Sequence, residues 1–252
     1  MVKSVMMEAV MRLGILQAGE NSKNMPAGTP AYPELFTGLF DRAGAGFDIT
    51  FVQVRLGEFP SSVDDYDAYL VTGSAAGVYD DLDWIAPLED FIRQAYSAGK
   101  PLAGICFGHQ VIANALGGKA EKSDKGWGCG VRTLPVLEQG SVFADGVEES
   151  TLLYMHQDQV TQAPPEATVL IGDAFCPVAS FAIGDQVLCF QGHPEFTPQV
   201  IAGITDLRQD DIGHERAARC HESLSTPHEG DDIGKRLTAF FNNATQQTAQ
   251  AV

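Results

Sequence analysis

Residues 104–113 read Gly-Ile-Cys-Phe-Gly-His-Gln-Val-Ile-Ala, between an apolar segment at 101–103 and an alanine-rich pattern that continues to residue 116. The sequence predicts a strand, a sharp turn at Cys106 and a helix. Gly104 and Gly108 flank that turn, where bulkier residues would collide as the backbone reverses. The turn lifts Cys106 to a helix N-terminus, where unpaired N–H groups and the helix dipole favour its thiolate. The alternative, a buried structural cysteine, is disfavoured by the two glycines.

A second motif, Gln-Gly-His-Pro-Glu-Phe at 191–196, follows the apolar run at 187–190. Pro194 disfavours the helical region for His193, so the segment is expected to be extended. Residues two apart in an extended chain point to the same side, which would place Glu195 beside His193 to orient its ring. Cys106, His193 and Glu195 then supply a nucleophile, a base and an orienting group. The alternative for His193 is a loop residue beside a proline.

These two motifs resemble those of the class I (triad) glutamine amidotransferases. Within that family, the sequence is most similar to stand-alone members that resemble the glutaminase domain of GMP synthase, and to plant-type γ-glutamyl peptidases. The resemblance runs from about Arg12 to about Phe241 and implies a Cys-His-Glu triad acting on the γ-amide of a glutaminyl group. The further segments that carry it lie at 57–60, 66–74, 83–85, 116–119, 156–158 and 164–167.

A tetrahedral oxyanion needs hydrogen-bond donors that are already aimed at it. The N–H of Phe107, directly after the nucleophile, is one expected donor. The resemblance implies that the turn at Gly73 and Ser74 supplies the other, although Gly73 is equally explained as an ordinary end of a strand. Here the turn continues Ala75-Ala76, where relatives often have proline or glycine, so this sequence departs from the family pattern at the second donor.

The resemblance also implies that Gln110 and the segment His156, Gln157 and Asp158 line the pocket for the glutamyl group. Each has a simpler alternative, because His156 could be a core histidine and Gln110 could cover a helix surface. The stretch at 126–131 resembles the family's pocket-wall strand. The residues themselves assign no role to Trp127 and Cys129 within it.

Apolar runs alternate with helical patterns in the first half of the chain, which predicts an α/β fold. We expect a single domain over residues 11–245, with a central, mostly parallel sheet flanked by helices (the flavodoxin-like class I glutamine amidotransferase fold) and a strand-rich second half. Residues 1–10 are expected to form a disordered extension. Strands are predicted at 13–16, 49–54, 68–71, 102–105, 131–136, 152–155, 168–171, 178–183 and 187–190, and helices from Pro33 and at 84–97, 199–208 and 232–242.

The amino-acid composition of the chain restricts its possible binding partners and its cellular compartment. A formal net charge of −17 argues against a nucleic-acid surface or an anionic membrane, either of which needs clustered Lys and Arg. The five cysteines form no Cys-x-x-Cys pair, which fits a reducing, cytoplasmic location. The first residues do not resemble a signal peptide, and no apolar run is long enough for a membrane span. We expect no cofactor, and no metal site at the adjacent pair Cys220-His221.

Function is therefore expected to be glutamine amidotransferase-type hydrolysis of glutamine or a γ-glutamyl amide through a Cys106 thioester. The alternative from the same chemistry is a γ-glutamyl peptidase. A cysteine enzyme of the α/β-hydrolase kind is disfavoured, because there the acid usually precedes the histidine, whereas Glu195 follows His193. A non-catalytic regulatory module is the remaining alternative. No room for a synthetase domain is evident in the sequence, so any ammonia would pass to a separate synthetase partner or to water.

Overall fold

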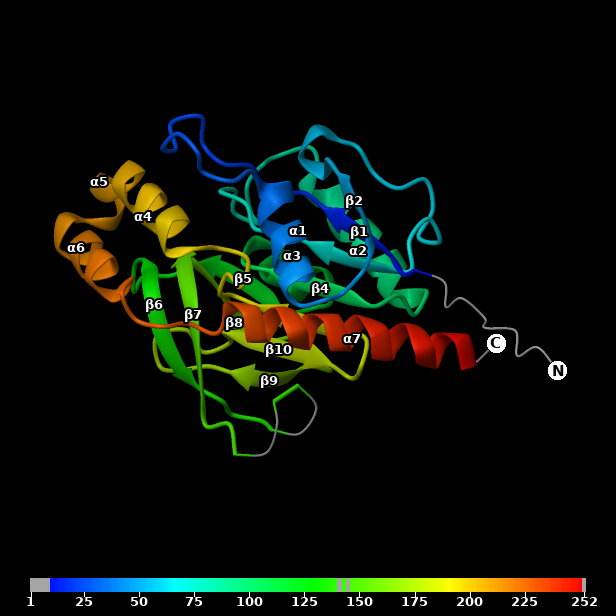
Figure 1. The fold of residues 1–252 in the computed structure, drawn as a ribbon. Coiled ribbons are helices and arrows are strands. Elements are labelled where there is room, and N and C mark those ends of the chain that lie inside the picture. Colours follow the sequence, from blue (N-terminus) through cyan, green and yellow to red (C-terminus); the bar gives the residue numbers. More distant parts are fainter. Residues whose placement is uncertain (1–9, 140–141, 144–145, 251–252) are drawn as a thin grey trace.

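A computed structural model describes residues 10–139, 142–143 and 146–250 (Figure 1). The extension expected at residues 1–10 lies outside this part of the chain, apart from residue 10. In the described residues, a seven-stranded sheet forms the centre of the molecule. Its first five strands are mutually parallel, and β10 runs antiparallel to both of its neighbours. The order is β2 (Asp48–Val52), β1 (Arg12–Leu16), β3 (Ala68–Val71), β4 (Leu102–Ile105), β11 (Val187–Phe190), β10 (Ser180–Ile183) and β9 (Thr168–Ile171).

Helices cover both faces of this sheet because its strands are apolar on both sides. Successive residues such as Ile15 and Leu16 belong to two different buried clusters, one on each face. Helices α1 (Tyr32–Arg42) and α7 (Gly230–Gln250) pack together on one face, where Figure 1 shows α7 in red lying along the strands. Helices α2 (Ile85–Ser97) and α3 (Phe107–Ala115) pack on the other face. The expectation of a mostly parallel, helix-flanked sheet is confirmed.

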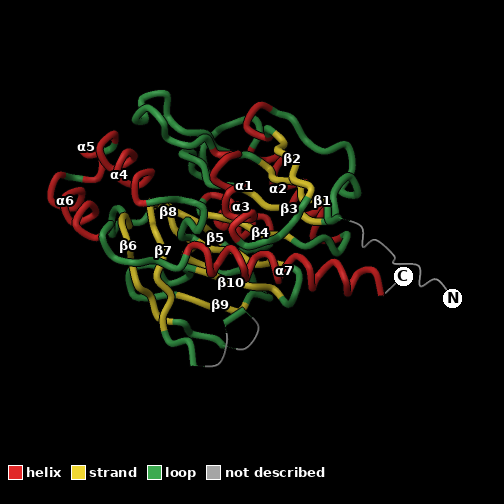
Figure 2. Tube along the Cα trace, in the orientation of Figure 1, coloured by secondary structure: helices red, strands yellow, loops and turns green. Residues whose placement is uncertain are grey.

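The second half is strand-rich, as expected, and adds two antiparallel pairs outside the central sheet (Figure 2). The longer pair joins β6 (Gly128–Pro135) to β7 (Glu149–His156), and helices α4 (Pro198–Leu207) and α6 (His214–Ser223) pack against it. The shorter pair joins β5 (Lys119–Lys122) to β8 (Asp158–Gln162). Four elements were not predicted from the sequence: β5, β8, α6 and the short α5 (Gln209–Ile212). These segments are mostly polar.

Four strands differ from the prediction by two residues or more at one end. The strands expected at 131–136 and 152–155 both begin three residues earlier, because β6 and β7 pair with each other along their whole length. The other two differ for local reasons. The strand expected at 49–54 ends at Val52, and Val54 begins a 3-10 turn that closes at Gly57 in a left-handed conformation with φ 81°. The strand expected from residue 178 begins at Ser180, where its pairing with β9 shifts register. Within the described residues, no helix combines the length and apolarity that a membrane span requires.

Candidate active site

Cys106 occupies the turn between β4 and α3, at the carboxyl end of the central sheet. Its φ of 54° and ψ of −104° are unusual, and it is the sole non-glycine residue in the described part of the chain with a positive φ. Such a backbone is strained for an L-residue and is typical of functional sites. The Cys106 N–H donates to the Phe190 carbonyl at 2.8 Å, which ties the turn to the neighbouring strand β11.

The glycines that flank Cys106 are required by close packing. A Cβ on Gly104 would lie 2.5 Å from the carbonyl group of Gly108, and one on Gly108 would lie 2.1 Å from the Val71 carbonyl oxygen. Real Cβ contacts of that length do not occur, so both positions exclude any side chain. Close approach of α3 to β3 and β4 therefore depends on both glycines, which accounts for the spacing seen in the sequence.

His193 and Glu195 come directly after β11, beside the Cys106 turn. The His193 N–H donates to the Leu153 carbonyl at 2.8 Å, which holds the segment extended against β7. His193 Nδ1 lies 2.7 Å from Glu195 Oε1, as the two-residue spacing predicts, and both side chains are buried. The His193 ring is stacked on Phe196, with ring centres 4.0 Å apart. The ring is thus held by a hydrogen bond at one edge and by an aromatic face below it.

The environment favours the protonated form of His193. Burial alone lowers the pKa of the imidazole, but the negative charges of Glu195 and Cys106, with hydrogen bonds to both, outweigh it and raise the pKa to about 10. Cys106 Sγ also lies 4.0 Å from the Met155 carbonyl oxygen. Cys106 therefore faces a histidine whose protonated form is favoured and which a carboxylate contacts from the other side.

The turn at Gly73 and Ser74 closes the site from β3. A Cβ on Gly73 would lie 3.1 Å from His193 Cε1 and 3.6 Å from Cys106 Cβ, so the turn faces both side chains. Within the described residues, the N–H groups of Gly73, Ser74 and Phe107 donate to no protein acceptor. Thr72 stabilises the turn, because its hydroxyl donates to the Gly73 carbonyl at 3.0 Å. Free donors therefore lie on both sides of Cys106.

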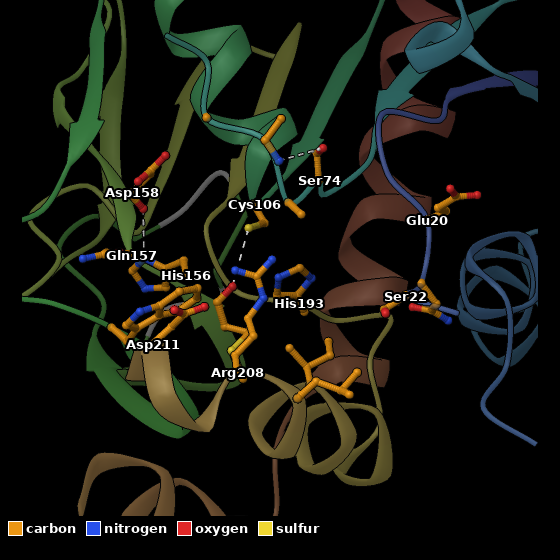
Figure 3. Close-up of a pocket in the computed structure, with 18 of the residues that line it drawn as sticks. Glu20, Ser22, Ser74, Cys106, His156, Gln157, Asp158, His193, Arg208 and Asp211 are labelled. Atoms are coloured by element: carbon orange, nitrogen blue, oxygen red, sulfur yellow. Dashed lines mark hydrogen bonds between the residues drawn. The ribbon is translucent and has the colours of Figure 1, made fainter. Parts of the chain in front are cut away.

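A cavity of about 760 Å³ opens over Cys106 and His193 (Figure 3). The expected pocket residues Gln110, His156, Gln157 and Asp158 all line it. Gln110 Nε2 donates to the Asp158 carbonyl at 2.9 Å, and His156 Nδ1 lies 3.0 Å from the same oxygen. The β7–β8 turn is thereby held against α3, and both side chains are almost fully buried. Gln110 is buried, so it does not cover a helix surface, whereas the burial of His156 also fits a core histidine.

His156 differs from His193 in charge. Burial lowers the pKa of His156 to about 3, so its ring is neutral near pH 7. A Cβ on Gly128 would lie 2.6 Å from His156 Nε2, so the glycine of the adjacent strand makes room for the ring. Asp158 accepts a hydrogen bond from the Tyr79 hydroxyl at 3.0 Å. The loop at 75–80, which departs from the family pattern, thus forms part of the cavity wall.

The same cavity is lined by further residues that were not singled out as site residues from the sequence, among them Tyr32, Trp127, Phe196 and Arg208. Phe196 could have been found, because it directly follows the His-Pro-Glu motif. Tyr32 begins α1 and packs edge-on against Phe196 with ring centres 6.1 Å apart. Tyr32, Trp127 and Arg208 belong to segments far apart in the chain, so no local signal places them beside Cys106.

Comparison with known proteins agrees with this geometry. The family model for glutamine amidotransferase class-I matches residues 42–202. Gamma-glutamyl peptidase 3 of Arabidopsis thaliana is 31% identical over 247 residues, which is 94% of this chain and 98% of the relative. A GMP synthase [glutamine-hydrolyzing] of Aquifex aeolicus (strain VF5) is 34% identical over 132 residues, 52% of this chain and 25% of the relative.

Among crystal structures, a glutamine amidotransferase from Thermotoga maritima has the same fold. It superimposes with a TM-score of 0.73 at 14% identity, over 94% of this chain and 99% of that chain. A glutamine amido transferase from Methylobacillus flagellatus also has a TM-score of 0.73, at 17% identity and over 94% of this chain and 96% of that chain. By the match of its sequence, the chain belongs to the class I glutamine amidotransferase family.

Proposed function

We propose that this chain hydrolyses the γ-amide bond of a γ-glutamyl compound, either glutamine or a γ-glutamyl peptide, through a thioester on Cys106. The observation that carries the proposal is the strained Cys106 turn, which opens beside the His193–Glu195 pair into one cavity. Family membership supplies independent support for the reaction class. A regulatory module without activity would not need the positive φ at Cys106 or the buried carboxylate behind His193.

The first half of the reaction forms the thioester. The Cys106 thiolate attacks the γ-carbonyl carbon, and the C=O electron pair moves to oxygen. As the tetrahedral intermediate collapses, the C–N bond breaks and the protonated His193 gives its proton to the departing nitrogen. Ammonia leaves when the substrate is glutamine, and an amino acid or peptide leaves when it is a γ-glutamyl peptide. Neutral His193 then takes a proton from water, whose oxygen attacks the thioester and releases glutamate.

The remaining site residues have supporting roles in this proposal. The N–H groups of Phe107 and of the Gly73–Ser74 turn stabilise the oxyanion, because they are unpaired and lie on both sides of Cys106. Glu195 orients His193 and stabilises its positive charge. The glutamyl group lies against Gln110 and the segment His156, Gln157 and Asp158, which line the cavity.

The size of the cavity supports activity on γ-glutamyl peptides as well as on glutamine. About 760 Å³ is well beyond what one glutamine side chain fills, and it lies in the range of sites for larger small molecules, roughly 300–1,000 Å³. The name of the Arabidopsis relative also supports peptides as substrates. We further propose a cytoplasmic setting, which the five unpaired cysteines favour. Any ammonia released passes to a separate synthetase partner or to water.

A hydrolysis screen tests the proposal. Glutamine and γ-glutamyl-alanine are each incubated with wild type, with Cys106→Ala and with Cys129→Ser, a control at a half-buried cysteine outside the cavity. We expect wild type and the control to release glutamate from at least one substrate, and Cys106→Ala to release none. Activity that survives in Cys106→Ala would contradict the thioester. A preference for the dipeptide of about tenfold in kcat/KM, or 1.4 kcal/mol, would make the peptidase the main activity.

A further inference from the structure

Arg208 presents an unused cation to the cavity. It lies at the end of α4, where its backbone joins α4 to α5, and its side chain points into the space that contains Cys106 (Figure 3). Within the described residues, the guanidinium makes no hydrogen bond and no ion pair with protein atoms. Asp211 lines the same cavity three residues later, yet the two side chains form no ion pair. Five N–H donors are therefore free at the cavity that holds the nucleophile.

Trp127 positions this cation. The Arg208 guanidinium carbon lies 5.3 Å from the centre of the Trp127 ring, within the range of a cation–π contact. Arg216 Nη1 in turn donates to the Trp127 carbonyl at 2.6 Å, which fixes the β5–β6 loop that carries the ring. An arginine that rests on an aromatic face keeps its planar fork available for a second partner. This contact gives Trp127, which the sequence left without a role, a position in the site.

The charge of the cavity identifies what Arg208 would bind. Four carboxylates line the cavity: Glu20, Asp80, Asp158 and Asp211. Glu20 forms an ion pair with Arg55 at 2.7 Å. The other cation that lines the cavity is Lys122, whose positive charge partly offsets the rise that burial causes in the pKa of Asp158. In a chain with a net charge of −17, an unpaired arginine is the feature that selects an anion. Guanidinium groups match carboxylates in a bidentate geometry.

We infer that Arg208, held on Trp127, binds a carboxylate of the substrate. This inference rests on the proposed function, because every γ-glutamyl compound carries a carboxylate on the glutamyl α-carbon, and a γ-glutamyl peptide carries a second one on its leaving group. The carboxylate is either the one on the α-carbon of the glutamyl group or the one on the amino acid that leaves. In the view of Figure 3, Arg208 is drawn between His156 and His193, and all three residues line the cavity that contains Cys106.

The test measures three substrates with wild type and with three protein variants. Glutamine carries only the glutamyl α-carboxylate, γ-glutamyl-alanine carries both carboxylates, and γ-glutamyl-alaninamide lacks the one on the leaving group. Arg208→Met removes the charge and keeps an apolar stem over Trp127. Arg219→Met is the matched control, because Arg219 is exposed, pairs with Glu215 on α6 and does not line the cavity. Arg208→Lys keeps the positive charge but loses the planar guanidinium, which can donate two parallel hydrogen bonds to one carboxylate.

We expect Arg208→Met to raise KM for γ-glutamyl-alanine at least about tenfold, or 1.4 kcal/mol, with kcat changed much less. Arg208→Lys should recover part of this loss, and Arg219→Met should match wild type. If Arg208 binds the leaving group, γ-glutamyl-alaninamide and glutamine lose little. If it binds the glutamyl α-carboxylate, all three substrates lose equally. An unchanged KM for every substrate, or an equal loss in Arg219→Met, would overturn the inference.

A binding measurement separates this inference from the proposed function. In a Cys106→Ala background, calorimetry measures the Kd of each compound with and without Arg208→Met. A Kd weakened about tenfold by Arg208→Met supports the inference even if wild type hydrolyses none of the compounds, a result that would overturn the proposed function alone. A Kd that does not change, or the absence of binding by all three compounds, overturns the Arg208 inference.

Discussion

Replacement of Gly73 by alanine adds one methyl group to the turn that faces Cys106 and His193. That methyl would lie 3.1 Å from His193 Cε1 and 3.6 Å from Cys106 Cβ. Carbon atoms pack best at roughly 3.5–4.0 Å, so the His193 ring must move by about 0.4 Å or more. The ring cannot move freely, because Glu195 holds it through a 2.7 Å hydrogen bond and Phe196 is stacked against it at 4.0 Å.

The magnitude follows from this displacement. Gly73 does not have a positive φ, so alanine can adopt its backbone and the fold should persist. Misplacing a catalytic group by about 1 Å costs on the order of 10²-fold in rate, and a shift of a few tenths of an ångström should cost less. We therefore expect kcat/KM to fall about 10- to 100-fold, which corresponds to roughly 1.4–2.7 kcal/mol of transition-state stabilisation.

Gly38→Ala provides a matched control for this variant. A Cβ on Gly38 would also lie 3.1 Å from its nearest neighbour, but that neighbour is Nη1 of Arg42, the end of a flexible side chain on the same helix. We expect Gly38→Ala to keep wild-type kcat/KM and to be no less stable, since alanine favours the helix interior. The assay is glutamate release with thermal unfolding in parallel. Wild-type activity in a stably folded Gly73→Ala would refute the reasoning.

Three further predictions follow from the same geometry. Glu195→Gln should reduce kcat at least about tenfold less than His193→Ala, because the carboxylate orients a ring that transfers the proton, and equal losses in two folded variants would contradict this division. The kcat/KM profile should fall as pH rises through about 10, where His193 loses the proton that the leaving nitrogen needs. Glu195→Gln should move this fall in kcat/KM to lower pH, because the variant lacks the negative charge that opposes the lowering of the His193 pKa by burial. A fall at an unchanged pH would contradict this prediction. Gly108→Ala should lower the free energy of unfolding by about 2 kcal/mol or more, measured by urea denaturation, because its Cβ would lie 2.1 Å from the Val71 carbonyl oxygen.

The sequence predicted the features that depend on short-range chemistry. Gly104 and Gly108 indicated the turn at Cys106, because a tight reversal constrains the residues within it. Pro194 placed Glu195 beside His193, because the spacing along an extended chain fixes the side to which residues point. The parallel strands could also be predicted from the sequence, because strands that are buried on both faces appear as continuous apolar runs.

What the sequence could not predict depends on tertiary contacts. Strands β5 and β8 are short and polar, and they are defined by pairing with each other rather than by apolar alternation. Arg208 and Trp127 are far apart in the chain and meet because α4 and α6 pack on β6. The unpaired N–H of Gly73 is likewise visible only once the turn is placed beside Cys106.

In the proposed reaction, Cys106 carries the glutamyl group during turnover. The most direct test mixes the enzyme with γ-glutamyl-alanine, quenches with acid during turnover, digests the protein and examines every cysteine-containing peptide by mass spectrometry. We expect a mass increase of one glutamyl group on the peptide that contains Cys106, and on no peptide that contains Cys129, Cys176, Cys189 or Cys220. Steady release of glutamate with no adduct on Cys106, together with wild-type turnover by Cys106→Ala, would contradict it.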